Sequence, residues 1–298
     1  MRASRFLSCL LALLFAVAVP AALSAAPAAA TKASPPWRVM SFNIRYGTAP
    51  DGEDAWPKRA DNLFRTIEAF NADLLGFQEV VAMQHDALIA RFPGFGFAGV
   101  ARDDGKRKGE FSSIAYRKDR FSLVAEGTFW LSETPEVVAS KSWDTSLTRI
   151  CTWVRLKETA TGREVFFANT HFDHRGVQAR RESAKLISRR ATELAQGLPA
   201  ILTGDFNLNE DDTGYAQLVR PAYAGALRWI DSYRALHPQR SPEEASFNGF
   251  KGTVKGSRID FVFHTAEFKA TAGEIVRTAY AGRYPSDHYP VTAVLELK

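Results

Sequence analysis

The stretch Ala200-Ile201-Leu202-Thr203-Gly204-Asp205-Phe206-Asn207 contains the pattern that decides the fold. An apolar run of strand length ends at Gly204 and is followed at once by Asp205 and Asn207. In α/β sheets, polar residues that follow the strands converge on the crevice where ligands bind. An Asp after a Gly is usually only a turn residue, so this stretch needs support from the rest of the chain.

Other apolar segments of the chain end in the same way. Asn43, Glu79 and His171 each close an apolar run, and Asp260 and His288 lie in two further segments of this kind. Each residue alone favours a structural role, such as capping a turn. Six such segments in one chain are hard to obtain by chance, so we expect their polar residues to form one site.

The apolar runs also predict the elements around that site. Helical spacing of apolar residues occurs at Leu63, Ile67 and Phe70, and again near Ala184 and Ile187. Strands are predicted at 38–44, 74–77, 113–117, 148–156, 164–169, 200–203, 258–263 and 291–297. Strand–helix–strand order early in the chain, followed by runs of strands, indicates a layered α/β protein.

The composition excludes several classes of protein. The chain has 298 residues, of which 24% are charged and 46% hydrophobic, so a disordered chain, a collagen-like fibre and a coiled coil are excluded. Two cysteines cannot build a disulfide scaffold. The net charge of +5 is weak evidence for a nucleic-acid partner. The chain has no G-x-G-x-x-G turn after a predicted strand and no phosphate-binding P-loop, so nothing supports a redox cofactor.

The N-terminus has the features of a secretory signal. Arg2 and Arg5 precede an apolar stretch that is too short to span a bilayer, and small residues follow. We predict a signal peptide over residues 1–30 with cleavage at about 26–30, and an uncleaved membrane anchor is the alternative. Residues 31–36 form a short tether and 37–298 one domain. The expected product is an exported monomer, periplasmic or extracellular, with no membrane span.

Together the strand-end segments resemble the signature blocks of the endonuclease/exonuclease/phosphatase superfamily, which includes deoxyribonuclease I, neutral sphingomyelinases and nocturnin-like deadenylases. The resemblance runs from about Trp37 to the C-terminus. It implies a four-layer α/β sandwich, with two mixed sheets face to face and helices outside. It also implies metal-dependent phosphoester hydrolysis. The matching segments are Ser41-Phe42-Asn43, Gln78-Glu79-Val80, Asn169-Thr170-His171, Gly204-Asp205-Phe206-Asn207, Arg258-Ile259-Asp260 and Ser286-Asp287-His288-Tyr289-Pro290.

A metal ion is expected because phosphoester cleavage needs a cation on the anionic oxygens. Hard oxygen ligands favour Mg²⁺, with Mn²⁺ as the alternative. Glu79 is the best ligand, Asn43 supplies a neutral oxygen, and Asp287 contacts the metal directly or through water. The lack of a Cys/His ligand cluster argues against a dedicated zinc site.

The resemblance implies the catalytic roles. Asp205 activates or orients the attacking water, and Asn207 positions the water or the phosphate. His288 is the second base or a charge stabiliser, and Asp260 orients its ring. His171 donates a hydrogen bond to a phosphate oxygen. Which of these groups is the true base is left open.

Two further residues are expected to support the site. Glu110 matches the carboxylate that partners the histidine equivalent to His171 in deoxyribonuclease I-like members, and Arg149 is a candidate phosphate ligand. Asp173 and His174 follow His171 closely, but as loop residues we expect them to be solvated.

The substrate is the least determined part of the prediction, because function resides in the loops that a fold carries. We expect hydrolysis of a phosphodiester, with a nuclease as the leading interpretation. A phosphomonoesterase and a lipid or sugar phosphodiesterase are the alternatives. A secreted binding protein without catalysis is less favoured, because no residue of the matching segments is replaced.

Overall fold

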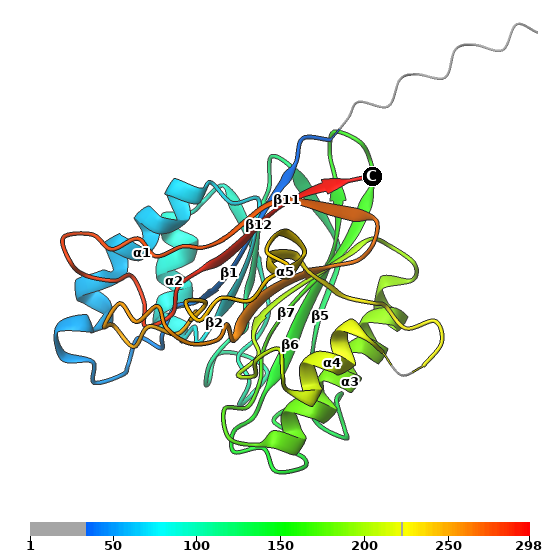
Figure 1. The fold of residues 1–298 in the computed structure, drawn as a ribbon, viewed down its shortest axis with the longest axis horizontal. Coiled ribbons are helices and arrows are strands. Elements are labelled where there is room, and N and C mark those ends of the chain that lie inside the picture. Colours follow the sequence, from blue (N-terminus) through cyan, green and yellow to red (C-terminus); the bar gives the residue numbers. More distant parts are fainter. Residues whose placement is uncertain (1–33, 222) are drawn as a thin grey trace, which may run out of the picture. The chain divides into compact units, whose positions relative to one another are not determined.

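Two six-stranded β-sheets form the centre of the fold (Figure 1). The computed structural model describes residues 34–221 and 223–298, so the predicted signal peptide and its cleavage site lie outside the described residues. The strand order of the first sheet is β11-β12-β1-β2-β4-β3. Its strands are β1 (Trp37–Asn43), β2 (Leu74–Gln78), β3 (Phe95–Ala98), β4 (Ile114–Arg117), β11 (Phe268–Ile275) and β12 (Val291–Leu297).

The second sheet has the order β5-β6-β7-β8-β10-β9. Its strands are β5 (Phe121–Trp130), β6 (Ile150–Glu158), β7 (Glu164–His171), β8 (Ala200–Asp205), β9 (Ile230–Asp231) and β10 (Asp260–His264). The helices are η1 (Gly52–Asp54), α1 (Trp56–Phe70), α2 (Ala82–Arg91), α3 (Val177–Ala195), α4 (Thr213–Val219) and α5 (Ser232–Leu236).

Each sheet has a parallel pair of strands at its centre, and its other pairings are antiparallel. In the first sheet β1 and β2 are parallel and α1 connects them. In the second sheet β7 and β8 are parallel and α3 connects them. The strands β1 and β2 contact β7 and β8 across the interface between the sheets. The carboxyl ends of all four strands therefore reach the same region, where the site forms.

Three apolar layers hold this arrangement together. Leu63 and Ile67 of α1 pack on the outer face of the first sheet, and Ala184 and Ile187 of α3 pack on the outer face of the second. A third cluster, which includes Val39, lies between the two sheets. Helices and sheets thus form four layers, and the predicted four-layer α/β sandwich is confirmed.

Near the site, the interface between the sheets becomes polar and very close. A Cβ atom on Gly76 of β2 would clash with the second sheet, because it would lie 2.0 Å from Thr203 Oγ1 and 2.4 Å from Asn169 Oδ1. Gln78 donates from Nε2 to Asn169 Oδ1 at 2.7 Å, and Gly204 N donates to Ser41 Oγ at 3.1 Å. These hydrogen bonds give partners to buried polar groups, which would otherwise destabilise the fold.

The predicted strands correspond to the interior strands of the two sheets, and the edge strands β3, β5, β9 and β11 were missed. An edge strand has one exposed side and lacks a continuous apolar run. In β5 and β11, register shifts at Leu123/Ala125 and Ala270/Ala272 also break the alternation of apolar and polar residues.

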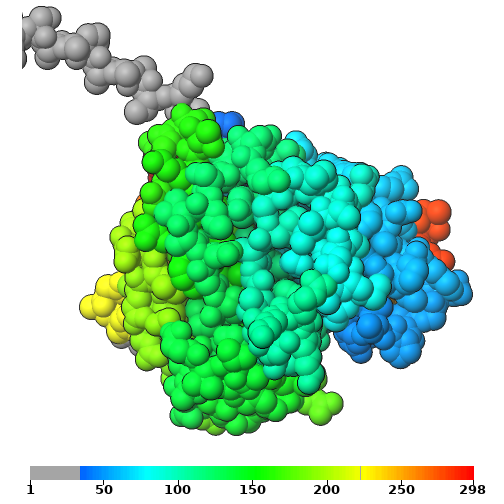
Figure 2. Space-filling model, turned by 180° about the vertical axis from the view of Figure 1, so that it is seen from behind, coloured from blue at the N-terminus to red at the C-terminus, as the bar shows by residue number. Residues whose placement is uncertain are grey.

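On the face shown in Figure 2, the segments of β3 and β4 (cyan) lie beside those of β5 and β6 (green). The two sheets are therefore in contact at this edge as well as at their centre. Within residues 34–221 and 223–298, none of the helices has the length and apolarity needed to cross a bilayer.

Candidate active site

The carboxyl ends of the four central strands open into a cleft of about 520 Å³. All of the predicted site residues except Asn43 and Asp260 line this cleft. Asn43 and Asp260 are outside the lining, but each is hydrogen-bonded to a residue in it. The structure thus brings every predicted site residue together. Those in the lining are Glu79, Glu110, Arg149, His171, Asp205, Asn207, Asp287 and His288.

Strand register places three of these residues in a row. Asp205 is the last residue of β8, and it pairs with His171 of the parallel strand β7. On its other side it pairs with Asp260 of the antiparallel strand β10. Because both faces of β8 are buried, the register of its pairing with β7 and β10 is fixed. This register determines which residues lie beside Asp205.

Asn43 joins the two sheets at the site. Its Nδ2 donates to Glu79 Oε1 at 3.0 Å and to Asp205 Oδ2 at 2.9 Å, and its Oδ1 accepts from the backbone of Arg45. Glu79 has φ of +60°, a conformation that costs energy for a residue with a side chain. Glu79 is held there because its Oε2 also accepts from Tyr46 N. Such strain is concentrated at functional sites.

The carboxylates fit a divalent metal ion. Ligand atoms of Glu79, His171 and Asp205 lie within 4.8 Å of one another. The carboxylates of Glu79 and Asp205 both accept from the Asn43 amide. The pKa of Asp287 is raised by burial and by the charge of Glu79. A bound cation would relieve the repulsion between these neighbouring carboxylates, and oxygen donors suit Mg²⁺ or Mn²⁺. When bound, such an ion would polarise a phosphoryl oxygen and acidify water.

His288 is held in its charged form. Its Nδ1 donates to Asp260 Oδ2 at 2.9 Å, and its Nε2 lies 3.8 Å from Asp205 Oδ2. Burial opposes the charge, but the carboxylates of Asp260 and Asp205 raise the pKa of His288 well above its ordinary value. A charged imidazole at this place can donate a hydrogen bond to a phosphoryl oxygen or a proton to a leaving alcohol.

His171 is held neutral, only 3.5 Å from the same carboxylate. Burial and the positive charges of Arg149 and Arg102 lower its pKa well below the ordinary value. Asn207 donates from Nδ2 to His171 Nε2 at 3.1 Å, which assigns the ring proton to Nδ1. The two histidines of the cleft therefore have opposite charge states set by their surroundings, the pattern expected for separate acid and base roles.

Asp205 lies between these histidines and has an unusual affinity for protons. Burial and the charge of Asp260 raise its pKa to about 7, although His288 and hydrogen bonds from Asn43 and Asn207 oppose this. A base is most effective when its pKa is close to the working pH. Asp205 can therefore accept a proton from water near neutral pH.

Arg149, the predicted phosphate ligand, lines the cleft with donors that have no partner among the described residues. It is 4% exposed, and its Nε and Nη1 have no hydrogen-bond partner among the described residues. Buried unpaired donors of a guanidinium are costly, and an anionic oxygen would satisfy them. His174 lies 3.2 Å from Nη2, and Asp173 Oδ2 lies 3.6 Å from Nε.

The expectation that Asp173 is solvated was wrong. Asp173 is buried and accepts hydrogen bonds from the backbone of Leu147, Arg175 and Gly176 and from the Ser146 hydroxyl. Those hydrogen bonds hold its pKa far below the ordinary value despite burial. Asp173 therefore fixes the loop that contains Arg149. His174 is exposed, as expected, and lines the cleft.

Glu110 lies near His171, as the resemblance implied, but its hydrogen bonds go elsewhere. Its Oε2 is 3.8 Å from His171 Nδ1, whereas both oxygens accept from Arg102, at 2.7 and 2.9 Å. Arg102 was missed as a site residue, because in the sequence it belongs only to a mixed-charge segment. Arg45, two residues after Asn43, also lines the cleft and was missed. Its closeness to Asn43 is the signal that could have found it.

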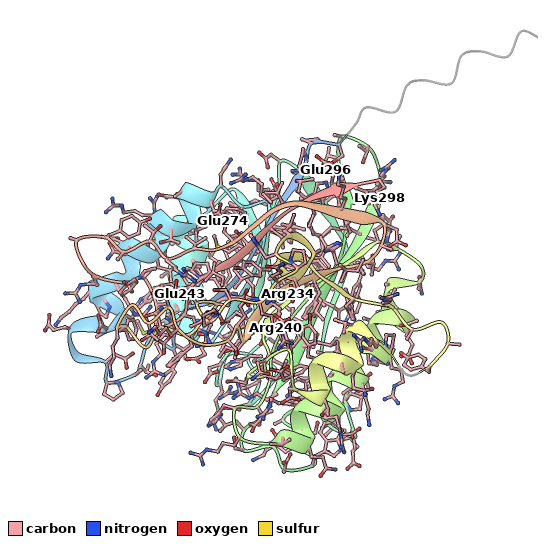
Figure 3. All side chains as sticks on the ribbon, in the orientation of Figure 1. Arg234, Arg240, Glu243, Glu274, Glu296 and Lys298 are labelled. Atoms are coloured by element: carbon pink, nitrogen blue, oxygen red, sulfur yellow. The ribbon has the colours of Figure 1, made fainter. Side chains whose placement is uncertain are left out.

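A buried ion network supports Asp260 from behind. Arg258, two residues earlier, is 1% exposed and pairs with Asp231 at 2.7 Å and Glu210 at 2.6 Å. Arg234 on α5 and Arg240 lie close together (Figure 3), and both pair with Glu210. Ion pairs anchored on three elements hold the start of β10 in place, and with it the hydrogen bond from His288.

Comparisons with known proteins find relatives of this chain. A model of the endonuclease/exonuclease/phosphatase family matches residues 40–288. A solved structure of a family member from Bacteroides thetaiotaomicron has 36% sequence identity and a TM-score of 0.80, covering 89% of this chain and 99% of that one. The mannosyl-6-phosphatase of the same organism has 38% identity and a TM-score of 0.80, covering 87% of this chain and 99% of that one.

Matches to curated relatives cover a smaller share of each protein. An uncharacterized protein of Acanthamoeba polyphaga mimivirus is 23% identical over 276 residues, covering 77% of this chain and 39% of that protein. This chain therefore spans well under half of that relative.

Proposed function

The chain belongs to the endonuclease/exonuclease/phosphatase family and is a hydrolase that acts on phosphoester bonds, and on this basis we propose that it removes the phosphate group from a phosphorylated sugar with the help of a divalent metal ion. The observation that carries the proposal is the buried guanidinium of Arg149, which lines the cleft together with His171 and Asp205 and whose Nε and Nη1 have no hydrogen-bond partner among the described residues. A terminal phosphate fits this position, because it offers several anionic oxygens to one guanidinium.

The cleft favours a small neutral alcohol rather than a polyanion. Leu147, Ile259 and Phe247 line it, and Arg45 and Arg149 are its arginines among the described lining residues. Nucleic-acid binding depends on cations along the whole contacted backbone, which this lining lacks. The similarity to a mannosyl-6-phosphatase at 38% identity also supports a sugar phosphate.

Cleavage of a nucleic-acid diester, the leading interpretation of the sequence, is the second candidate. The Phe247 ring favours it, because it is 49% exposed at the cleft and nucleobases stack on aromatic rings.

One comparison separates the two candidates. Phosphate release from mannose 6-phosphate would be measured beside hydrolysis of bis-p-nitrophenyl phosphate, with Mg²⁺ and with Asp205→Asn as the blank. We expect kcat/KM for the monoester to exceed that for the diester. Efficient diester cleavage without release of phosphate from the sugar would reject the proposal and favour the nuclease.

Arg149→Gln tests the phosphate position directly. It should lower kcat/KM for the monoester by about 10- to 100-fold, since a charged hydrogen bond contributes about 1.5–3 kcal/mol. Arg155→Gln is the matched control, because Arg155 lies on β6 and pairs with Glu164 away from the cleft. Equal activity of both variants would remove Arg149 from the site.

We also propose that the metal is Mg²⁺ and that the chain is exported as a monomer. The oxygen-rich ligand set supports the metal, and residues 1–30 support export. Cell fractionation of the full chain, compared with a chain lacking residues 1–30, tests export. A protein that stays in the cytoplasm in both forms would contradict it.

A further inference from the structure

A second cavity of about 490 Å³ lies outside the cleft described above. Leu186 and Ser188 of α3 line it, as do the aromatic residues Trp143 and Tyr223. No residue of this cavity belongs to the predicted site. We propose that it binds an unphosphorylated, neutral sugar unit.

The aromatic wall is the first support. Trp143 is half-buried against the core of the second sheet, and Tyr223 is 42% exposed. Aromatic faces offer large, rigid apolar contact area, which suits the C–H face of a sugar ring. A pocket with two such faces and a few polar groups has the composition of a small-molecule site.

Trp143 is held in this wall at an energetic cost. Its φ is +59°, which is uncommon for any residue with a bulky side chain. The next residue, Asp144, fixes the backbone, since its carboxylate accepts from Ala179 N at 2.6 Å at the start of α3. Strain of this kind persists where surrounding structure enforces it, and it is concentrated at binding sites.

One of the lining residues has an unsatisfied hydroxyl. Ser188 is 1% exposed, and its Oγ has no hydrogen-bond partner among the described residues. A buried hydroxyl without a partner destabilises a fold. A ligand rich in hydroxyl groups would satisfy it.

The charges around the cavity balance, which favours a neutral ligand. Glu182 and Lys185 form an ion pair at 3.0 Å across one turn of α3. The other charged lining residues, Glu133 and Arg189, have opposite signs. Neither an anion nor a cation would gain net attraction here.

The loop that contains Trp143 also reaches the catalytic cleft. Leu147, four residues later, lines that cleft. Four residues span at most about 14 Å, so the two cavities lie within the reach of a short oligosaccharide. Resting on the proposed function, we infer that the substrate is a phosphorylated glycan, with its phosphate in the cleft and a neighbouring sugar in the second cavity.

Binding of mannobiose, measured by calorimetry, tests the sugar site without any turnover. We expect saturable binding that weakens at least tenfold in Trp143→Ala and measurably in Ser188→Ala. Ser188→Ala should not destabilise the fold, because it removes an unpaired hydroxyl from a helix and introduces the best helix former. Trp153→Ala is the matched control, since Trp153 is a half-buried tryptophan outside both cavities. No binding by the unaltered protein, or equal binding by Trp143→Ala, would overturn the proposal.

Kinetics then test the link to the substrate. In Trp143→Ala, KM should rise about tenfold for a 6-phosphorylated mannobiose and stay within twofold for mannose 6-phosphate. Equal KM changes for both substrates would show that Trp143 acts only on the fold. If the unaltered protein releases phosphate from neither sugar, the proposed function is rejected. The binding of mannobiose would still show whether the second cavity is a sugar site.

Discussion

At the scale of single residues, burial rather than residue type determines the chemistry of this protein. His171 and His288 lie near the same Asp205 carboxylate, yet burial beside arginines lowers the pKa of one, and two carboxylates raise the pKa of the other. The sequence predicted both histidines but could not predict their charge states, because Arg102 and Arg149 come from other segments. A third buried histidine, His264, shows the same physics away from the cleft.

His264 should make the fold sensitive to mild acid. It is 2% exposed, accepts or donates one hydrogen bond with Ser232, and burial lowers its pKa to about 4. Well above pH 6.5 it is neutral in both the folded and the unfolded state, so it causes no loss of stability. As the pH falls from about 6.5 to about 4, only the unfolded chain takes up the proton, which costs about 3 kcal/mol of stability.

Urea unfolding at a series of pH values measures this effect. His264→Gln should flatten the fall in unfolding free energy between pH 6.5 and 4, and the exposed His237→Gln should leave it unchanged. A His264→Gln protein with the same pH slope as the unaltered chain would contradict the assignment.

At the scale of elements, close contact between the sheets and clamping of loops position the site. The interior strands could be predicted because both of their faces are buried and their apolar runs are continuous. The edge strands and the short helices α4 and α5 could not, because half-exposed segments lack such a pattern. Arg59 of α1 could not be predicted either, since a helical arginine normally indicates a solvated face.

Gly76 of β2 permits the close approach of the sheets. Gly76→Ala would place a methyl group on Thr203 and Asn169, both backed by β-strands, so the sheets would have to separate. Overpacking of this kind costs about 1–3 kcal/mol or more. Denaturant unfolding checks this, with Gly94→Ala as the control because nothing lies within 4 Å of a Cβ there. Equal stability of the two variants would show that the sheets can relax.

Arg59 clamps the two loops of the cleft. Its buried guanidinium donates to the carbonyls of Ile44 and Arg45 after β1 and to that of Pro285 before the segment of His288. Arg59→Lys cannot reach all of these carbonyls, so we expect a loss of about 2–4 kcal/mol in stability and a lower kcat. Arg65→Lys, an exposed position on the same helix, is the control. An Arg59→Lys protein with unchanged stability and kcat would refute the clamp.

At the scale of the whole molecule, two similar halves create one site. Each half is a sheet with a parallel central pair, and the ends of both pairs meet where Asn43 bridges Glu79 and Asp205. The strand-end residues could be predicted to converge, since this follows from how parallel strands end in a sheet. The second cavity could not, because it depends on how one loop folds over α3.

The central claim is metal-dependent hydrolysis of a phosphomonoester at this site. The most direct test is phosphate release from mannose 6-phosphate as a function of Mg²⁺ concentration, in the unaltered protein and in Glu79→Gln. EDTA should abolish release and Mg²⁺ should restore it, and Glu79→Gln should raise the Mg²⁺ concentration for half-maximal activity at least tenfold, because the variant loses a charged ligand. Phosphate release that persists in EDTA, or a Glu79→Gln protein with an unchanged Mg²⁺ requirement, would contradict the account.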